Sequence, residues 1–170
     1  MENKDDLKKL YDSNEYLTKI IGINTGVESS EDETEEKISA IISLLTDPEN
    51  KELKEQTLLV LKKSNAGDLL LSSISNQAVK NKKHILIAAC WESEINFSSK
   101  LPFFINLVNA SDYLVTLEAI TVIEHMEGPF SKTDLEKGIK KLKTEQKTAP
   151  SEKALLLKDL IIKLESITVK

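Results

Sequence analysis

Apolar helical segments recur along this 170-residue chain, each followed by a short polar turn and a second apolar helix. The pattern is visible in LLTDPENKELKEQTLLVLKK, SISNQAVKNKKHILIAACWE and LVNASDYLVTLEAITVIEHM, which return about every 30 to 34 residues. A pair of amphipathic helices cannot bury its apolar side alone, so consecutive pairs are expected to stack on one another. The sequence therefore predicts an all-α chain of stacked helical pairs, an α-α superhelix.

Turn and capping residues divide the repeated region into about four helical pairs. Three pairs are expected at roughly 32–46 with 48–64, 68–78 with 80–95, and 99–109 with 111–127. Helix starts are expected at Asp47-Pro48, at Ser111-Asp112 and at Ser131, because Ser and Asp side chains can accept a hydrogen bond from the first turn and proline is tolerated there. Ser131 opens a weaker fourth pair, whose first helix Gly138 is expected to interrupt. The final helix follows Pro150 and takes its apolar pattern from Leu155, Leu156, Leu160, Ile161 and Leu164.

The N-terminal region differs from the repeats. Residues 4–22 have the spacing of an amphipathic helix, and the run ESSEDETEE at 28–36 carries six acidic side chains. Early acids suit the helix dipole, so the run is interpreted as a solvated helix start, with an acidic interaction segment as the alternative. The predicted organisation is an N-terminal helix and acidic loop at 1–30, then a repeat domain at 31–170.

The charged residues argue against binding to nucleic acid. All 23 basic residues are lysine, and the net charge is −5. Arginine provides the planar, bidentate recognition of phosphate that this chain lacks. Binding to a nucleic-acid backbone also requires a dense positive field, which an acidic chain does not supply.

The single cysteine and the hydropathy limit the class of protein further. Cys90 excludes an intramolecular disulfide and a cysteine-rich metal site, and its place in ILIAACW predicts a buried hydrophobe rather than a reactive thiol. The N-terminus has no apolar core for secretion, and no stretch approaches the roughly 18 apolar residues of a membrane span. We therefore expect a cytoplasmic protein without a membrane anchor.

The turn and second-helix segments LTDPENKELKEQTLLVL, ISNQAVKNKKHILIAAC and VNASDYLVTLEAITVI resemble those of HEAT and armadillo-like helical repeats. The resemblance covers about residues 32–168 and is architectural, since HEAT units often carry an arginine at a set point and this chain has none. It implies a curved, right-handed stack whose second helices line an inner face. Such proteins generally use that face to hold another protein.

Register arithmetic gives a candidate binding surface. Val108 of the third pair matches Ile74 of the second, an offset of 34 residues (108 − 74). The same offset sets Trp91 beside His125 at the ends of the second helices. An aromatic side chain among carboxylates can hold a cationic segment of a partner. The predicted contact set is Trp91, Glu92, Glu94, Glu118 and His125.

The same residues have other interpretations. They could be ordinary solvated helix ends with Trp91 packed beneath. His125 with Glu124 or Glu127 offers imidazole and carboxylate ligands, but a chain with two histidines has little to build a metal site from. No G-x-S-x-G motif and no glycine-rich phosphate loop is present, so the sequence predicts neither catalytic residues nor a cofactor.

We therefore expect a non-enzymatic interaction module that binds a protein or peptide on the inner face of the stack. A small-ligand or metal-binding enzyme site near Trp91 and His125 is the first alternative. Nucleic-acid binding through a C-terminal lysine cluster is the second, although a solvated face or a contact with an acidic partner also explains that cluster. Its members are Lys132, Lys137, Lys140, Lys141, Lys143 and Lys147. The oligomeric state stays open.

Overall fold

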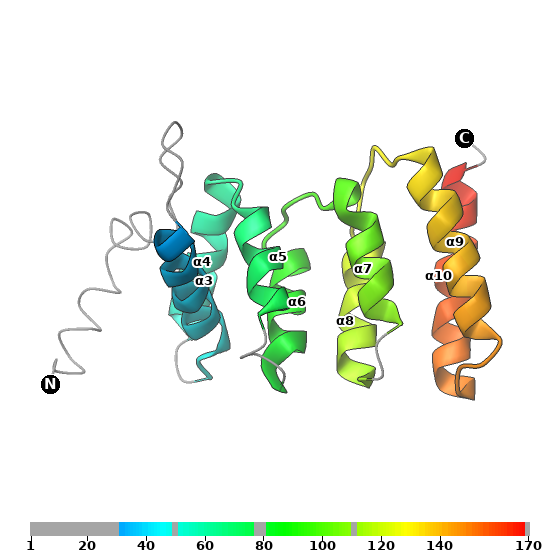
Figure 1. Cartoon of the computed structure of the whole chain (residues 1–170), viewed down its shortest axis with the longest axis horizontal. Helices are drawn as coiled ribbons and strands as arrows, with labels where there is room; N and C mark the ends of the chain where they lie inside the picture. Colours follow the sequence, from blue (N-terminus) through cyan, green and yellow to red (C-terminus); the bar gives the residue numbers. More distant parts are fainter. Residues whose placement is uncertain (1–30, 49–50, 77–80, 110–111, 169–170) are drawn as a thin grey trace, which may run out of the picture. The chain divides into compact units, whose positions relative to one another are not determined.

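The structure, a computed structural model, describes residues 31–48, 51–76, 81–109 and 112–168. Within these residues the secondary structure consists of eight α-helices and short 3-10 turns, with no strand (Figure 1). The all-α prediction is therefore confirmed. The predicted helix at 4–22 lies outside the described residues. The chain divides into two compact units, of which the first ends at Ile95 and the second begins at Asn96. The repeat domain predicted over 31–170 thus contributes to both.

The first unit contains two helical pairs. These are α3 (Glu31–Thr46) with α4 (Lys51–Lys63), and α5 (Gly67–Ser75) with α6 (Lys83–Glu92). Helix α3 contacts the other three helices, so it forms the centre of the unit. The apolar faces meet in a core with no more than 1% exposure at any of Ile41, Leu45, Leu61, Leu70, Ile74, Leu86 and Ile87. Burial of such side chains is the main term that stabilises a unit of this kind.

The second unit contains the other two pairs. A 3-10 turn (Ser98–Lys100) leads into α7 (Leu101–Val108), which pairs with α8 (Tyr113–Glu124), and α9 (Lys132–Gln146) pairs with α10 (Ser151–Thr168). Helix α7 also contacts α9, so the first helices of the two pairs pack together. The third and fourth predicted pairs are both present, and the fourth is as well formed as the third.

Two of the predicted helix starts are confirmed by their hydrogen bonds. The Asp112 carboxylate accepts a hydrogen bond from the backbone N–H of Val115 at 3.1 Å, and the Ser131 hydroxyl accepts one from the N–H of Asp134 at 3.3 Å. These are N-cap bonds, which satisfy donors that have no partner inside the helix.

The predicted interruption at Gly138 is wrong. Helix α9 continues through this residue, which is buried. A Cβ atom added there would lie 3.4 Å from Cγ1 of Ile105 on α7. The missing side chain therefore allows α9 to approach α7 closely, and this packing outweighs the weak helix propensity of glycine.

The predicted second helices are too long at their C-terminal ends. Helix α6 was expected to reach residue 95 but ends at Glu92, and α8 was expected to reach 127 but ends at Glu124. Glu94 adopts a left-handed conformation with φ of 54°, which cannot continue a right-handed helix. Glycine usually occupies that position, so a glutamate there gave no stop signal in the sequence.

Candidate functional site

Glu92, at the end of α6, is held by an ion pair inside the first unit. The Lys54 ammonium on α4 lies 2.7 Å from Glu92 Oε2 and 3.0 Å from Oε1. Both side chains are about three-quarters buried, with 26% and 25% exposure. A carboxylate near a helix C-terminus is unfavourable for the helix dipole. The pair with Lys54 offsets that cost, so joining α4 to α6 is a structural role for Glu92.

Glu94 has a similar but more exposed partner. Its carboxylate accepts a hydrogen bond from Lys62, which also lies on α4. This hydrogen bond and the attraction of the ammonium lower the pKa of Glu94. The side chain is 73% exposed, so water screens the attraction. Both acids of the predicted contact set in this unit therefore have lysine partners within it.

Trp91 precedes these acids in the last turn of α6 and is half-buried. Its neighbour Cys90 is fully buried, and burial raises the pKa of the Cys90 thiol well above its ordinary value. A raised thiol pKa leaves little of the nucleophilic thiolate. The prediction that Cys90 is a buried hydrophobe is confirmed.

Glu118 lies on α8 in the second unit, and His125 directly follows the last residue of that helix. They are seven residues apart, which places them on the same side of the helix, with Glu118 half-buried and His125 exposed. Nδ1 of His125 is 2.8 Å from the carbonyl oxygen of Thr121. A carbonyl oxygen only accepts, so Nδ1 carries the proton in this contact. His125 is also the C-cap residue of α8, and its backbone N–H donates to Thr121 and Val122.

The predicted contact set is thus divided between the two units. Trp91, Glu92 and Glu94 belong to the first, and Glu118 and His125 belong to the second. The helix ends also suggest a different register, because Glu92 and Glu124 end their helices 32 residues apart (124 − 92), not 34. When α6 and α8 are aligned by their last residues, Trp91 corresponds to Ile123 and not to His125. The contact set as one surface stays a prediction.

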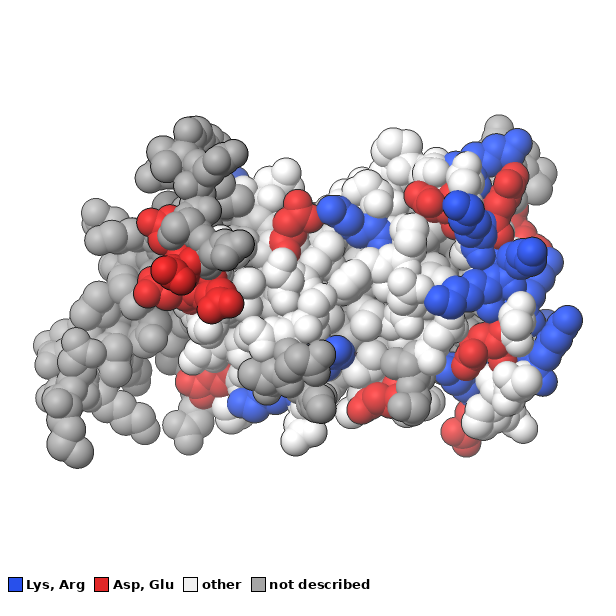
Figure 2. All heavy atoms as spheres, viewed as in Figure 1, with Lys and Arg blue, Asp and Glu red and all other residues white. Residues whose placement is uncertain are grey.

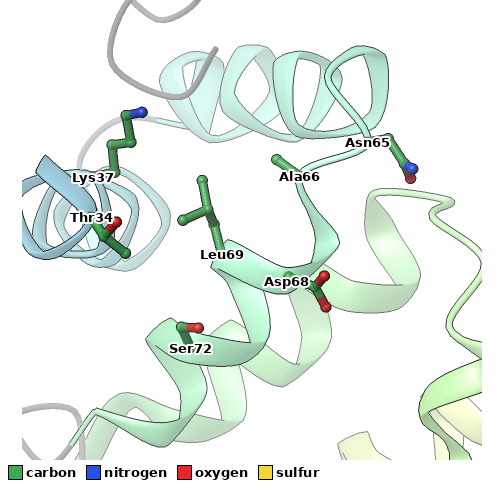
Figure 3. Close-up of a pocket in the computed structure, with 7 residues that line it drawn as sticks. All are labelled: Thr34, Lys37, Asn65, Ala66, Asp68, Leu69 and Ser72. Carbon is green, nitrogen blue, oxygen red and sulfur yellow. The ribbon is translucent and has the colours of Figure 1, made fainter. Parts of the chain in front are cut away.

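A hollow of about 310 Å³ lies in the first unit between α3, α5 and the turn that precedes α5 (Figure 3). Leu69 of α5 points into it beside α3, and Lys37 and Asp68 add one charge of each sign. Its volume is at the lower end for a small-molecule site. His125, the centre of the predicted enzyme alternative, lies in the other unit and does not line this hollow.

The charged side chains are unevenly distributed over the helices. Acidic side chains gather over α3 and lysines over α9 (Figure 2). Three of the six lysines in the predicted cluster have partners in the second unit. Lys143 lies 2.6 Å from Glu165, Lys132 lies 4.0 Å from Glu136, and Lys141 donates to Asn106. The two carboxylate partners reduce the positive field of α9, which weakens the case for nucleic-acid binding.

Helix α10 carries a feature that the sequence analysis missed. Leu155 is 64% exposed and Ile162 is 55% exposed, the two highest values among the large apolar side chains of the described residues. They are seven residues apart and lie on one side of the helix. The opposite side is buried in the unit through Leu157, Leu160, Ile161 and Leu164. In the sequence, Leu155 shares one apolar pattern with Leu160, Ile161 and Leu164, whereas the structure separates two apolar sides of one helix.

The remaining residues of this exposed side are polar. We call the whole set the α10 face; it consists of Ser151, Leu155, Lys158, Asp159, Ile162 and Ser166, all exposed. A helical-wheel count could have found it, because these positions follow the spacing i, i+4, i+7, i+8, i+11 and i+15. The sequence could not show which of the two apolar sides is covered.

Residues 31–48, 51–76, 81–109 and 112–168 contain no group of three or more histidine, cysteine, aspartate or glutamate side chains placed to hold a metal ion. None of the helices described is both long and apolar enough to cross a membrane. In comparisons with known proteins, the chain matches no family model, no curated protein and no solved structure.

Proposed function

We propose that this protein is a non-enzymatic interaction module that binds another protein through an exposed helix face. The observation that carries the proposal is the α10 face, where Leu155 and Ile162 are more than half exposed on a helix already packed into its unit. Single exposed apolar residues are common, but two on the same side of one helix form the apolar centre of a docking surface. Burying both against a partner would contribute about 1.5 to 3 kcal/mol for each side chain at full burial.

The stacked architecture supports the same proposal. In each unit the first helices of consecutive pairs pack against each other, α3 on α5 and α7 on α9. Such packing is expected for the α-α superhelix of HEAT and armadillo-like proteins, to which we propose the four pairs belong. A prearranged helical surface loses little conformational entropy on binding, which favours recognition of a protein or peptide.

Capture of partners by substituted proteins tests the surface. The full chain is used as bait with wild-type sequence, with Leu155→Lys and with Ile162→Lys. Both substitutions replace exposed side chains, so the fold is expected to survive, which thermal unfolding by circular dichroism checks. Leu59→Lys on α4 is a matched control, because Leu59 is 45% exposed in the first unit. We expect the same proteins to be lost from both α10 variants and retained by the control.

A further variant compares this surface with the contact set predicted from the sequence. Trp91→Ala combined with Glu94→Lys changes the end of α6 and leaves α10 intact. If this variant loses the captured proteins and the α10 variants keep them, the surface lies at the end of α6 and the proposal for α10 is wrong.

A further inference from the structure

The α10 face carries two charges of opposite sign, so the faces of two copies of this chain can pair with opposite charges in contact. Lys158 and Asp159 lie midway between Leu155 and Ile162, on opposite edges of the face. Neither forms an ion pair or a side-chain hydrogen bond with any other residue that the structure describes. The centre of the face therefore consists of two apolar residues with one free cation and one free anion between them.

If the α10 faces of two copies of the chain pack together, the positions of these charges decide whether the two helices run parallel or antiparallel. When two identical helices pair in parallel about a two-fold axis, opposite edges meet at the same height. Lys158 of each copy then lies beside Asp159 of the other, while Leu155 meets Leu155 and Ile162 meets Ile162. In an antiparallel pair equal edges meet, so lysine would face lysine and aspartate would face aspartate. Charges at the edges of paired helices set their orientation in this way in coiled coils.

We propose that the partner of the α10 face is a second copy of this chain, paired through parallel α10 helices. The inference rests on the proposed function, since it names the occupant of the same surface. A two-fold pair is self-complementary, so the contact closes after two copies and does not extend into a fibre.

The expected dimer is weak. One helix pair buries less than the roughly 1,200 Å² of a stable interface, so we expect a dissociation constant on the order of 10 to 100 μM. Sedimentation equilibrium from about 1 to 500 μM covers this range. Leu155→Lys and Ile162→Lys should each raise the dissociation constant by about tenfold or more, because they place like charges at the centre of the pair. Leu59→Lys should leave it unchanged.

Charge exchange gives the more specific test. Lys158→Asp and Asp159→Lys should each weaken self-association, because each creates like-charge contacts across the pair. A mixture of these two variants should form heterodimers, and the double variant with both changes should associate like the wild type. The loss in each single variant distinguishes the parallel pair, since an antiparallel pair would place like charges together in the wild type and in every variant.

A cysteine cross-link tests the orientation independently. Ser166→Cys should give a disulfide-linked dimer under mild oxidation, because Ser166 meets its own copy only in the parallel pair. The buried Cys90 is not expected to react. A Ser43→Cys variant, exposed on α3 in the first unit, is the control and should not cross-link at the same concentration.

The outcomes separate this proposal from the proposed function. A wild-type chain that stays monomeric at the highest concentration overturns the second-copy proposal. If Leu155→Lys still abolishes capture of a different protein, the α10 face remains a binding surface with another occupant. Dimers that persist in both lysine variants would place self-association on another surface and overturn the second-copy proposal, while loss of a captured protein in the same variants still tests the proposed function.

Discussion

The two units share packing between the first helices of their pairs and differ in what is added to it. In the first unit, α4 and α6 are linked by two ion pairs, Lys54 with Glu92 and Lys62 with Glu94. In the second, α7 and α9 meet where Gly138 lies against Ile105. Ion pairs weaken with added salt, whereas close apolar packing does not. The first unit therefore adds to its helix packing a contribution that salt weakens.

The loops of the two units do not share this difference. In the second unit, neutral hydrogen bonds join the segment before α7 to the segment after α8. Asn96 donates to the Gly128 carbonyl at 2.6 Å, and the Gly128 N–H donates to the Ser98 hydroxyl at 2.8 Å. In the first unit, the turn after α4 is closed by backbone bonds of Asn65 and Ala66. The loops of both units are thus closed by neutral hydrogen bonds.

The largest expected effect tests the apolar contact in the second unit. Gly138→Leu should destabilise the protein by about 2 to 3 kcal/mol, because the new side chain must displace Ile105 from a packed site. Gly138→Ala is the matched control. Its methyl group fits at 3.4 Å from Ile105, and alanine is about 1 kcal/mol better than glycine in a helix, so stability should stay equal or rise.

Denaturant unfolding measures the stability of both Gly138 variants, and amide hydrogen exchange shows whether α7 and α9 lose protection. Equal tolerance of leucine and alanine would mean that close approach at Gly138 does not join these helices.

The half-buried ion pair in the first unit should have the next largest effect. Lys54→Met leaves the Glu92 carboxylate partly buried without its partner, which should cost about 1 to 2 kcal/mol, between the values for surface and buried pairs. Glu92→Gln removes the negative charge of the same ion pair and leaves Lys54 in place. A double-mutant cycle gives the coupling energy, which should shrink at about 1 M salt, where the Debye length is about 3 Å. A coupling near zero at low salt would show that the pair does not join α4 to α6.

The smallest expected effect concerns Glu94. Its pKa is lowered by the hydrogen bond and charge of Lys62, so the folded state binds this proton less readily than the unfolded chain. The resulting stabilisation is present above the ordinary glutamate pKa and is lost as the pH falls through the lowered value. Lys62→Met should return the pKa of Glu94 toward its ordinary range, as followed by NMR titration of the side-chain carboxyl. An unchanged pKa in this variant would assign the shift to another cause.

Much of the fold could be predicted from the sequence. The periodic apolar residues gave all four helical pairs, and the short polar side chains of Asp112 and Ser131 marked helix starts correctly. Local signals failed where tertiary contacts decide the structure. Gly138 was expected to interrupt a helix because the closeness of Ile105 is not visible in sequence. Glu94 gave no stop signal because its left-handed conformation is unusual for glutamate.

The candidate site was less predictable than the fold. Glu92 and Glu94 were interpreted as partner-binding acids, but their lysine partners lie on α4, more than 30 positions earlier in the chain. The α10 face was missed because both sides of that helix are apolar, and composition does not show which side is covered. The division of the chain at Ile95 also has no signal in the repeat pattern.

The buried position of Cys90 makes its thiol a natural probe of local opening in the first unit. The sulfur lies in the interior of the first unit, so a thiol reagent can reach it only when helix α6 transiently opens. The alkylation rate of the intact protein therefore measures how often that opening occurs. Because no other thiol is present, the signal comes from one place and needs no engineered label.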